Sequence, residues 1–400
     1  MNHPPSVAVC GGGLAGLALA TLLARDGHRP VVFESRMERE VRSEGLFLTL
    51  APNGLAALRA VGVEQAVRAA GMTTRALEIG NHLGRTLARI DHLDPDRRPA
   101  DMVTIGRGVL VGIVLDAARE AGVELRFGMR LANAQELADD VVLDFAAASR
   151  HRFDMVVAAD GLTSALRAAI FPAMPRPRYT GLTGTGGMIA MPDVPSTEGV
   201  MRMSFGRRAF FGYQKAGDGP VYWFNSYPVA ERDLMSVEDP VRFAAVLRQL
   251  HAGDPEPVGL ILRAVPTVDR HYPIYDMPAL PTWHTDRVVL VGDAAHAVAP
   301  HSGQGASMAL EDAVVLAACL REAAVPAAAF VRFEALRRDR TDAVIRIGRR
   351  NGSGKMASNA LARFLRDFLL PLFIPIGMTA ARRIATFRVD REPLAKPPAI

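Results

Sequence analysis

Cysteine is nearly absent from this 400-residue chain, which contains only Cys10 and Cys319. Two cysteines cannot form a disulfide framework, and because they are not arranged as CxxC or CxxxxC, a redox enzyme that works through a disulfide is not expected. No apolar run is long enough to cross a membrane, and the start of the chain lacks the charged and apolar regions of a secretory signal. We therefore expect a cytoplasmic protein without a membrane span.

Lysine is also scarce. Lys215, Lys355 and Lys396 are the only three, so arginine supplies most of the positive charge behind the net charge of +5. The arginines are scattered and form no basic block, which argues against nucleic-acid binding. The ten histidines show no HxH or HExxH spacing and no accompanying acidic cluster, so no metal site is expected.

Strand and helix patterns alternate at the beginning of the chain. A β-rich run over residues 6–10 leads into a glycine turn, an alanine- and leucine-rich helix over 17–26, and a second strand over 30–34. A strand over 287–291 and a helix over 306–322 repeat this pattern near the end. The order predicts an α/β fold built on a Rossmann-type sheet.

The middle of the chain has a different pattern. Between about residues 183 and 227, short β-rich runs are separated by proline, glycine and charged residues, which predicts an antiparallel sheet inserted into the α/β framework. Its large side chains alternate with period two, which indicates one buried face that is either core or pocket wall. They are Met201, Met203, Phe205, Phe211, Tyr213, Tyr222 and Phe224.

The tail from residue 327 is expected to be helical, with a break at residues 352–354. Residues 364–378 are strongly apolar and flanked by arginines, as in a helix that touches a membrane surface. A closing helix packed across both parts of the fold is favoured, because Pro371 and Pro375 interrupt a long amphipathic face.

Gly11, Gly13 and Gly16 form a GxGxxG motif between the first strand and its helix. The first glycine permits a tight turn, the second lets the backbone approach a pyrophosphate, and the third lets the helix pack closely on the strand. Glu34 ends the second strand, where an acid holds a ribose hydroxyl pair. The motif predicts a dinucleotide site but does not separate NAD from FAD.

Two later segments place an acid at the end of an apolar strand. Asp160 and Asp293 each end such a strand and precede a turn of small residues. That edge of an α/β sheet is where ligands bind. The glycines on either side of Gln304 permit close approach to a flat ring, and the helix that begins near Ala306 offers N–H groups to an anion.

Together, the three segments resemble the class A flavin-dependent monooxygenases, the family of the p-hydroxybenzoate hydroxylase-type aromatic hydroxylases, over about residues 7–350. The resemblance implies a discontinuous FAD-binding domain, an inserted β-sheet domain that binds the substrate, and a C-terminal helical segment. The expected boundaries are 1–75, 99–180 and 279–350 for the FAD-binding domain, 76–98 and 181–278 for the substrate-binding domain, and 351–400 for the helical segment.

The resemblance also implies which residues bind FAD. In the family, the glycine motif and the acid after it bind the ADP half, the later Gly-Asp pair binds the ribityl chain, and the Pro-x-x-Gly-Gln-Gly run packs against the isoalloxazine ring. The Asp-Gly segment is linked to NAD(P)H use, and the arginine that opens the second helix contacts FAD. For Arg42, contact with the flavin or NAD(P)H and a surface ion pair are both open. The cofactor-binding residues expected here are Gly11, Gly13, Leu14, Ala15, Gly16, Glu34, Ser35, Arg36, Arg42, Arg107, Asp160, Asp293, Pro300, Gly303, Gln304, Gly305 and Ala306.

The function implied by the resemblance is monooxygenation. NAD(P)H, bound transiently, reduces FAD, O2 adds to the reduced flavin as a C4a-hydroperoxide, and one oxygen atom passes to an aromatic or polyketide-like small molecule. Two alternatives remain open: a non-hydroxylating FAD oxidoreductase, such as a reductase or a halogenase-like enzyme, and a catalytically silent protein that binds flavin or an aromatic ligand. No catalytic base is assigned and the oligomeric state stays open. A structural role is favoured for His296 and His301 over a role in proton transfer or substrate binding.

Overall fold

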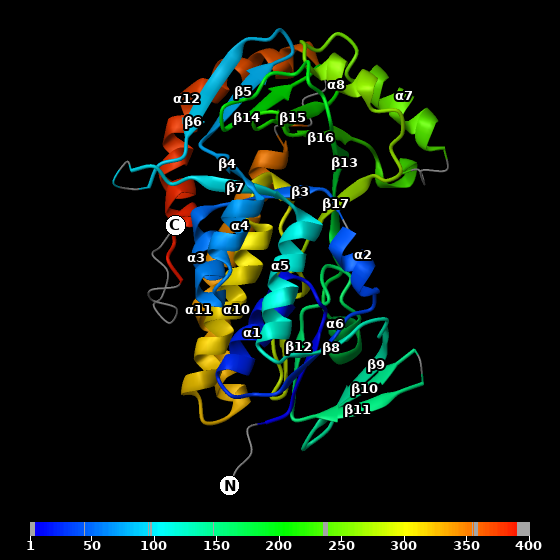
Figure 1. The fold of residues 1–400 in the computed structure, drawn as a ribbon, viewed down its shortest axis with the longest axis vertical. Coiled ribbons are helices and arrows are strands. Elements are labelled where there is room, and N and C mark those ends of the chain that lie inside the picture. The colour runs from blue at the N-terminus through cyan, green and yellow to red at the C-terminus, as the bar shows by residue number, and fades with distance from the viewer. Residues whose placement is uncertain are drawn as a thin grey trace.

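The protein has a parallel α/β body at one end and a larger, separate sheet at the other (Figure 1). The computed structural model describes residues 5–43, 45–94, 96, 98–146, 148–234, 239–353, 355 and 359–389.

The expected strand–helix–strand unit lies at the centre of a five-stranded parallel sheet. The sheet order is β18 (Val288–Leu290), β12 (Met155–Ala158), β1 (Val7–Cys10), β2 (Pro30–Phe33) and β8 (Glu124–Arg126). Every residue of β1 is buried. Central strands of parallel sheets are buried on both faces because crossover helices cover both sides. The predicted α/β fold with a parallel sheet is confirmed.

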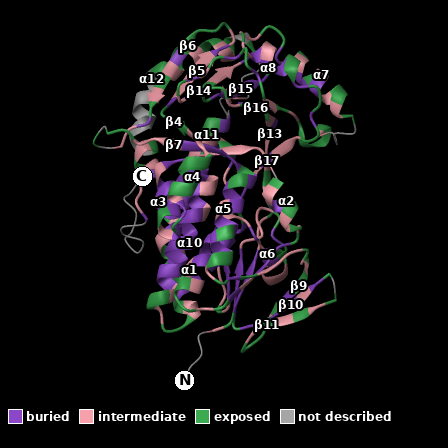
Figure 2. Ribbon diagram, in the orientation of Figure 1, coloured by how far each residue is buried: buried purple, intermediate pink, exposed green. Residues whose placement is uncertain are grey.

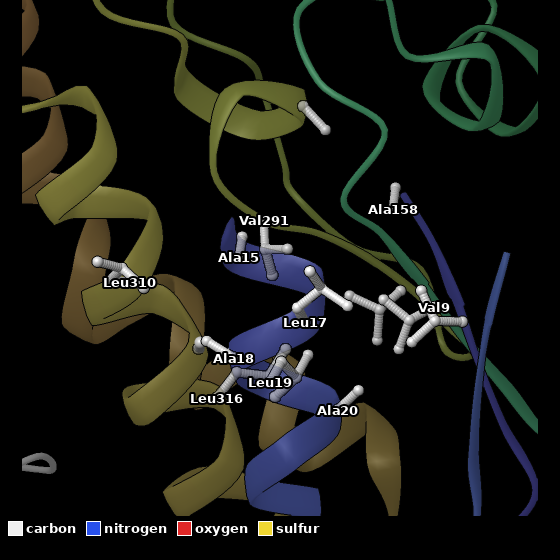
Figure 3. Packing of buried hydrophobic residues seen from close by; sticks show 14 of the residues in the cluster. Val9, Ala15, Leu17, Ala18, Leu19, Ala20, Ala158, Val291, Leu310 and Leu316 are labelled. Atoms are coloured by element: carbon white, nitrogen blue, oxygen red, sulfur yellow. The ribbon is translucent and has the colours of Figure 1, made fainter. Parts of the chain in front are cut away.

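Helices with small and aliphatic side chains cover this sheet. α1 (Leu14–Arg25) packs against α10 (Gly305–Glu322) and α5 (Arg107–Glu120). Figure 3 shows Leu17 between α1 and the strands, within the largest buried cluster. Burial of such a leucine stabilises the fold by about 1.5–3 kcal/mol. The body is therefore held by one continuous core, which appears as the buried interior in Figure 2.

A seven-stranded sheet forms the other end of the molecule. Its order is β17 (Tyr272–Asp276), β13 (Arg178–Ile189), β16 (Val221–Pro228), β15 (Phe210–Gln214), β14 (Val200–Phe205), β5 (Ala76–Asn81) and β6 (Thr86–Asp91). The predicted antiparallel sheet contains one parallel pair, β14 with β5. A parallel pair needs a long connection, and the chain between residues 81 and 200 supplies it.

One face of the seven-stranded sheet is closed by two helices. α7 (Pro240–Leu250) and α8 (Val258–Ala264) pack over Phe211 and Trp223, whose stacked rings have centroids 5.9 Å apart. This face is a hydrophobic core.

The opposite face carries most of the large side chains noted in the sequence. Residues directly across a strand pair share a face, and the register places Phe205 opposite Phe210 and Phe224 opposite Gly212. The predicted stripe is therefore divided between the two faces. Phe211 and Tyr213 lie on the helix-covered face, whereas Met201, Met203, Phe205, Tyr222 and Phe224 lie on the other.

A small three-stranded sheet joins the body to the seven-stranded sheet. It consists of β3 (Phe47–Leu50), β7 (Met102–Gly106) and β4 (Met72–Thr74). The Gln214 side-chain oxygen accepts hydrogen bonds from the hydroxyls of Thr74 at 2.9 Å and Thr104 at 3.2 Å. The junction is therefore buried but polar.

The remaining elements are α2 (Glu38–Ser43), α3 (Pro52–Val61), α4 (Glu64–Ala70), α6 (Ala165–Ile170), α9 (Asp293–His296), β9 (Leu131–Glu136), β10 (Val141–Phe145), β11 (Arg150–Phe153) and the 3-10 helices η1 (Glu231–Asp233) and η2 (Pro300–Ser302).

Two long helices follow. α11 (Pro326–Ser353) ends inside the predicted break, and α12 (Ala360–Ala385) lies against β6 and α3. α12 continues through Pro371 and Pro375, so the predicted interruption is not observed. Each proline removes one backbone hydrogen bond and costs about 3 kcal/mol, but the helix on either side keeps its own bonds. The first turns of α12 present an exposed apolar stripe of Leu361, Phe364, Leu365, Phe368 and Leu369. Within the described residues, no helix is long and apolar enough to span a membrane.

Candidate functional site

The glycine motif forms a tight turn between β1 and α1. Gly11 has φ +116°, and a Cβ there would lie 2.2 Å from the carbonyl oxygen of Ala159. A Cβ on Gly16 would lie 2.1 Å from the carbonyl oxygen of Gly11, whereas one on Gly13 would meet no atom within 4 Å. Two glycines are thus required by packing, and the third opens onto free space. The first N–H groups of α1, with no side-chain cap, lie beside that space and suit a pyrophosphate.

Glu34 lies at the end of β2, next to this turn. One carboxylate oxygen accepts a hydrogen bond from the Gly12 N–H at 2.8 Å. The other accepts from the Arg36 backbone N–H at 2.9 Å and from its guanidinium at 2.8 Å, with the Ser35 hydroxyl 3.3 Å away. Burial opposes ionisation, but these bonds to Arg36 and Gly12 hold the pKa of Glu34 below its usual value. Glu34 is therefore an ionised acceptor in a buried position.

Asp160 lies just beyond the end of β12. Its Oδ2 accepts a hydrogen bond from the Leu166 N–H at 3.0 Å, but its Oδ1 is buried without a partner in the described chain. Burial raises the pKa of this carboxyl. Arg167 links the segment to the next one, because its guanidinium donates to the carbonyl of Ala294 at 2.7 Å. An unpaired buried oxygen at the end of a strand is an open polar position for a ligand.

Asp293 follows β18 after Gly292, which has φ +56°. The Asp293 side chain is exposed to solvent, but at a position with protein around it. Desolvation by this protein raises the pKa of Asp293, and the positive charge of Arg107 opposes the rise. Arg107, at the start of α5, makes no ion pair with any described residue. An acid and a cation without close partners thus converge on one space, as expected of groups that bind a polar ligand.

The loop before α10 presents Gln304 to the same side of the sheet. Gly303 has φ +64°, which lets the chain turn from η2 into the helix. The Gln304 side-chain oxygen accepts a hydrogen bond from the Asn53 amide at 2.9 Å, and that amide also donates to Glu311 at 2.7 Å. The orientation of Gln304 is therefore set by α3, and its side-chain nitrogen makes no hydrogen bond within the described chain. The role of Asn53 could not be predicted from the sequence, because nothing in its local pattern distinguishes it.

A buried ion cluster lies behind this loop. Arg337 donates to Glu311 at 2.6 Å and to Asp312 at 2.8 Å, and Arg340 donates to Glu311 at 2.6 Å. All four side chains are at most 2% exposed. Neither arginine could be predicted from the sequence as buried, because charged residues on a helix usually face solvent.

Asp312 extends this cluster to the turn that carries Asp293. Its carboxylate accepts from the Gly292 N–H at 2.8 Å and from the His296 ring at 2.6 Å. Burial opposes ionisation of Asp312, but His296 and Arg337 lower its pKa to about 2. His296 therefore has the structural role that the sequence favoured. His301 is half-buried, and desolvation together with the charge of Lys355 lowers its pKa to about 3, so its ring is neutral.

Arg42 lies apart from these groups. It pairs with Asp116 on α5 at 2.5 Å and with Glu38 at 3.0 Å, and about a third of its side chain is exposed. Of the two roles left open for Arg42, the structure shows the surface ion pair.

Comparisons with known proteins agree with this arrangement. Residues 5–347 match a family model described as FAD binding domain. The chain is 32% identical over 371 residues to aurachin C monooxygenase/isomerase of Stigmatella aurantiaca, over 91% of this chain and 93% of the relative. It is 30% identical to 6-hydroxynicotinate 3-monooxygenase of Bordetella bronchiseptica, over 88% of this chain and 92% of the relative. Its fold matches that of a Klebsiella pneumoniae HpxO variant complexed with FAD, with a TM-score of 0.83, 25% identity, and coverage of 95% of this chain and 99% of that chain.

The chain belongs to this FAD-binding family, and within it to the class A flavin-dependent monooxygenases. The resemblance inferred from the three motifs is confirmed, and FAD is the cofactor. The residues present fit FAD: Gly13 leaves room for a pyrophosphate, Asp160 has an unpaired oxygen, and Arg107 has no ion-pair partner in the described chain.

Proposed function

We propose that this protein is an NAD(P)H-consuming monooxygenase that uses FAD to insert one oxygen atom from O2 into a small aromatic molecule. The observation that carries the proposal is the convergence of the Gly11 turn, the side chains of Asp293 and Arg107, which are unpaired in the described chain, and the Gln304 loop beside an aromatic sheet face. The named relatives support it, since two of them are monooxygenases by name.

In this proposal, FAD and the substrate are bound by different ends of the molecule. Residues 1–75, 99–180 and 279–350 bind FAD, and residues 76–98 and 181–278 bind the substrate. The segment predicted over residues 351–400, of which 390–400 lie outside the described residues, closes the fold through α12. The substrate lies between the flavin loop and the open face of the seven-stranded sheet. That face carries Phe224, whose ring lies 6.0 Å from that of Phe47 on β3, so apolar groups from both parts exclude water from the space between them.

Each part of the FAD site has a separate role. The turn at Gly11 and the start of α1 hold the pyrophosphate, Glu34 accepts hydrogen bonds from the ribose hydroxyls, and Asp293 accepts them from the ribityl chain. Gln304 donates through its free side-chain nitrogen to the edge of the flavin ring. When bound, FAD supplies the transfer of electrons from NAD(P)H and the activation of O2. The protein supplies position, shielding and fixed charge.

The decisive experiment is a coupling measurement on the FAD-loaded enzyme. A panel of phenols and polycyclic aromatics is tested for acceleration of NAD(P)H oxidation, with O2 uptake followed at the same time. We expect equal consumption of NAD(P)H and O2, and incorporation of one labelled oxygen atom into the product. Anaerobic reduction of the substrate with matching NAD(P)H oxidation would instead identify a reductase. Ligand binding without consumption of reductant under any condition would identify a silent binding protein.

A further inference from the structure

A cavity of about 250 Å³ opens at the turn between β14 and β15. Four of its lining residues are cationic, and none is acidic. The lining is Phe205, Gly206, Arg207, Arg208, Ala209, Phe210, Pro228, Leu250, Lys355 and Arg366. A small space with aromatic walls and only positive charge is suited to a flat anion.

The aromatic walls connect this cavity to the FAD-binding body. The ring centroids of Phe205 and Phe210 are 5.0 Å apart, and those of Phe210 and Phe224 are 6.1 Å apart. Phe224 in turn lies 6.0 Å from Phe47 on β3. These separations are typical of aromatic contacts. The cavity is therefore one end of a continuous aromatic surface on the open face of the sheet.

Arg207 and Lys355 are the cations in this lining whose side chains have neither an acid nor a carbonyl as a partner among the described residues. Arg207 is exposed to solvent, whereas Lys355 is half-buried. The Nζ of Lys355 lies 3.8 Å from the centre of the Phe210 ring, and the described chain gives it no hydrogen bond or ion pair. By contrast, Arg366 pairs with Asp367 at 2.8 Å, and Arg208 donates to the Gln249 carbonyl. Desolvation lowers the pKa of Lys355 to about 7. Such a half-buried cation gains a counter-ion only if a ligand brings one.

Lys355 also lies close to the loop assigned to the flavin. Four residues before it, the Asn351 amide donates to the His301 carbonyl in η2 at 3.2 Å. Gly352 packs so closely on the His301 ring that a Cβ there would lie 2.7 Å from it. The end of α11 therefore holds Lys355 between the loop at residues 300–302 and the aromatic face.

We propose that Lys355 is a substrate-positioning residue that binds the carboxylate of an aromatic acid in this cavity. The inference rests on the proposed function for the identity of the occupant as a substrate. Lys355 lies over the Phe210 ring and Arg366 over the Phe205 ring. The ring of the acid therefore packs against the aromatic surface beside these cations, while its carboxylate supplies the counter-ion that Lys355 lacks. The position of the charge then fixes which edge of the ring is turned toward the flavin loop.

The test compares benzoate with its neutral analogue benzamide on the FAD-loaded enzyme, with binding followed by the flavin absorbance spectrum and by calorimetry. At pH 6 we expect benzoate to bind about ten- to a hundredfold more tightly than benzamide, the range for a hydrogen bond between charged groups. Lys355→Met removes the ammonium and should abolish this preference, whereas Lys355→Arg should keep it. Arg232→Met, at an exposed site outside the cavity, is the matched control and should leave the preference unchanged.

The pH profile gives a test that needs no variant. A lysine with a lowered pKa is charged below that value and neutral above it, so the preference for benzoate should fall as the pH rises from 6 to 9. The charged and titratable groups around Lys355 are Arg207, Arg208, Arg366 with its partner Asp367, and the His251–Asp254 pair that packs on Gly206, while His301 is already neutral in this range. In Lys355→Arg the profile should be flat.

The outcomes separate this inference from the proposed function. If benzoate shows no preference over benzamide at pH 6, or if Lys355→Met keeps a preference, the inference is wrong even if turnover with neutral substrates supports the monooxygenase. If the preference behaves as described but no reductant is consumed with any ligand, the anion site stands and the proposed function fails.

Discussion

The two ends of the candidate FAD site are built in different ways. At the proposed adenosine end, Glu34 takes its hydrogen bonds from Gly12 and Arg36, all within one strand–helix–strand unit. At the proposed flavin end, Gln304 is oriented by Asn53, which lies 251 residues earlier in the chain. One end is therefore a product of local structure. The other forms only when several helices have packed together.

The acids at this site also differ in their partners. Glu34 and Asp312 accept several hydrogen bonds, which keep the pKa of each below its usual value. Asp160 and Asp293 have fewer partners, and desolvation by the surrounding protein raises the pKa of both. Asp312 is satisfied by the cluster that it holds together and Glu34 by its own turn, whereas Asp160 and Asp293 are left for the cofactor to satisfy.

The largest effect is expected from Arg337→Met, which tests the flavin end of the site, where the contacts are long-range. Glu311 and Asp312 would lose a shared buried cation, and an uncompensated buried charge costs about 3–5 kcal/mol of stability. Urea unfolding followed by circular dichroism measures this loss. Arg346→Met, on the exposed side of the same helix, should change stability by no more than about 0.5 kcal/mol. Similar midpoints for the two variants would show that the cluster does not hold the flavin end together.

Glu34→Ala tests the proposed adenosine end of the FAD site, which is built from local structure. A carboxylate that accepts hydrogen bonds from ribose hydroxyls contributes about 1.5–3 kcal/mol to binding, so the Kd for FAD should rise about ten- to a hundredfold. Stability of the FAD-free protein should fall far less than in Arg337→Met, because Glu34 is held by neighbours in its own turn. Titration of FAD-free protein with FAD gives the Kd. An unchanged Kd would place the ribose contact elsewhere.

The same comparison explains what could be predicted from the sequence. The Gly11 turn and Glu34 were predictable, because their geometry depends on neighbours within one βαβ unit. Arg337 could not be predicted as a buried cation, since a helix rich in arginine normally faces solvent. Nor could Phe210 be separated from Phe211, because adjacent aromatic residues fit either face and a shift of one residue exchanges the faces. The rest of the site depends on which helices meet in space.

Acid titration should distinguish the satisfied acids from the open ones. The pKa of Asp312 is about 2 in the folded protein, against a usual value of 3.8. A group with a lowered folded pKa stabilises the protein above its unfolded pKa, and this stability is lost as the pH falls from about 4 toward 2. The loss is roughly 2 kcal/mol for this one group. Unfolding free energies measured across that window should show a shallower fall in Asp312→Asn than in the unchanged protein. Parallel curves would contradict the assignment.

The smallest effect is expected from Arg42→Met. Arg42 stood among the cofactor-binding residues suggested by the sequence, but it pairs with Asp116 and Glu38 on a partly exposed surface. Pairs of this kind contribute about 0.5 kcal/mol or less, because solvent screens them and ordering the side chains costs entropy. We therefore expect an unchanged Kd for FAD and a barely altered unfolding midpoint. Arg107→Met is the matched comparison, since Arg107 has no ion pair in the described chain and lies opposite Asp293, and its loss should weaken FAD binding. If Arg42→Met weakens binding as much as Arg107→Met does, then the ion pair with Asp116 opens when FAD binds, and the flavin end extends farther along α5 than proposed here.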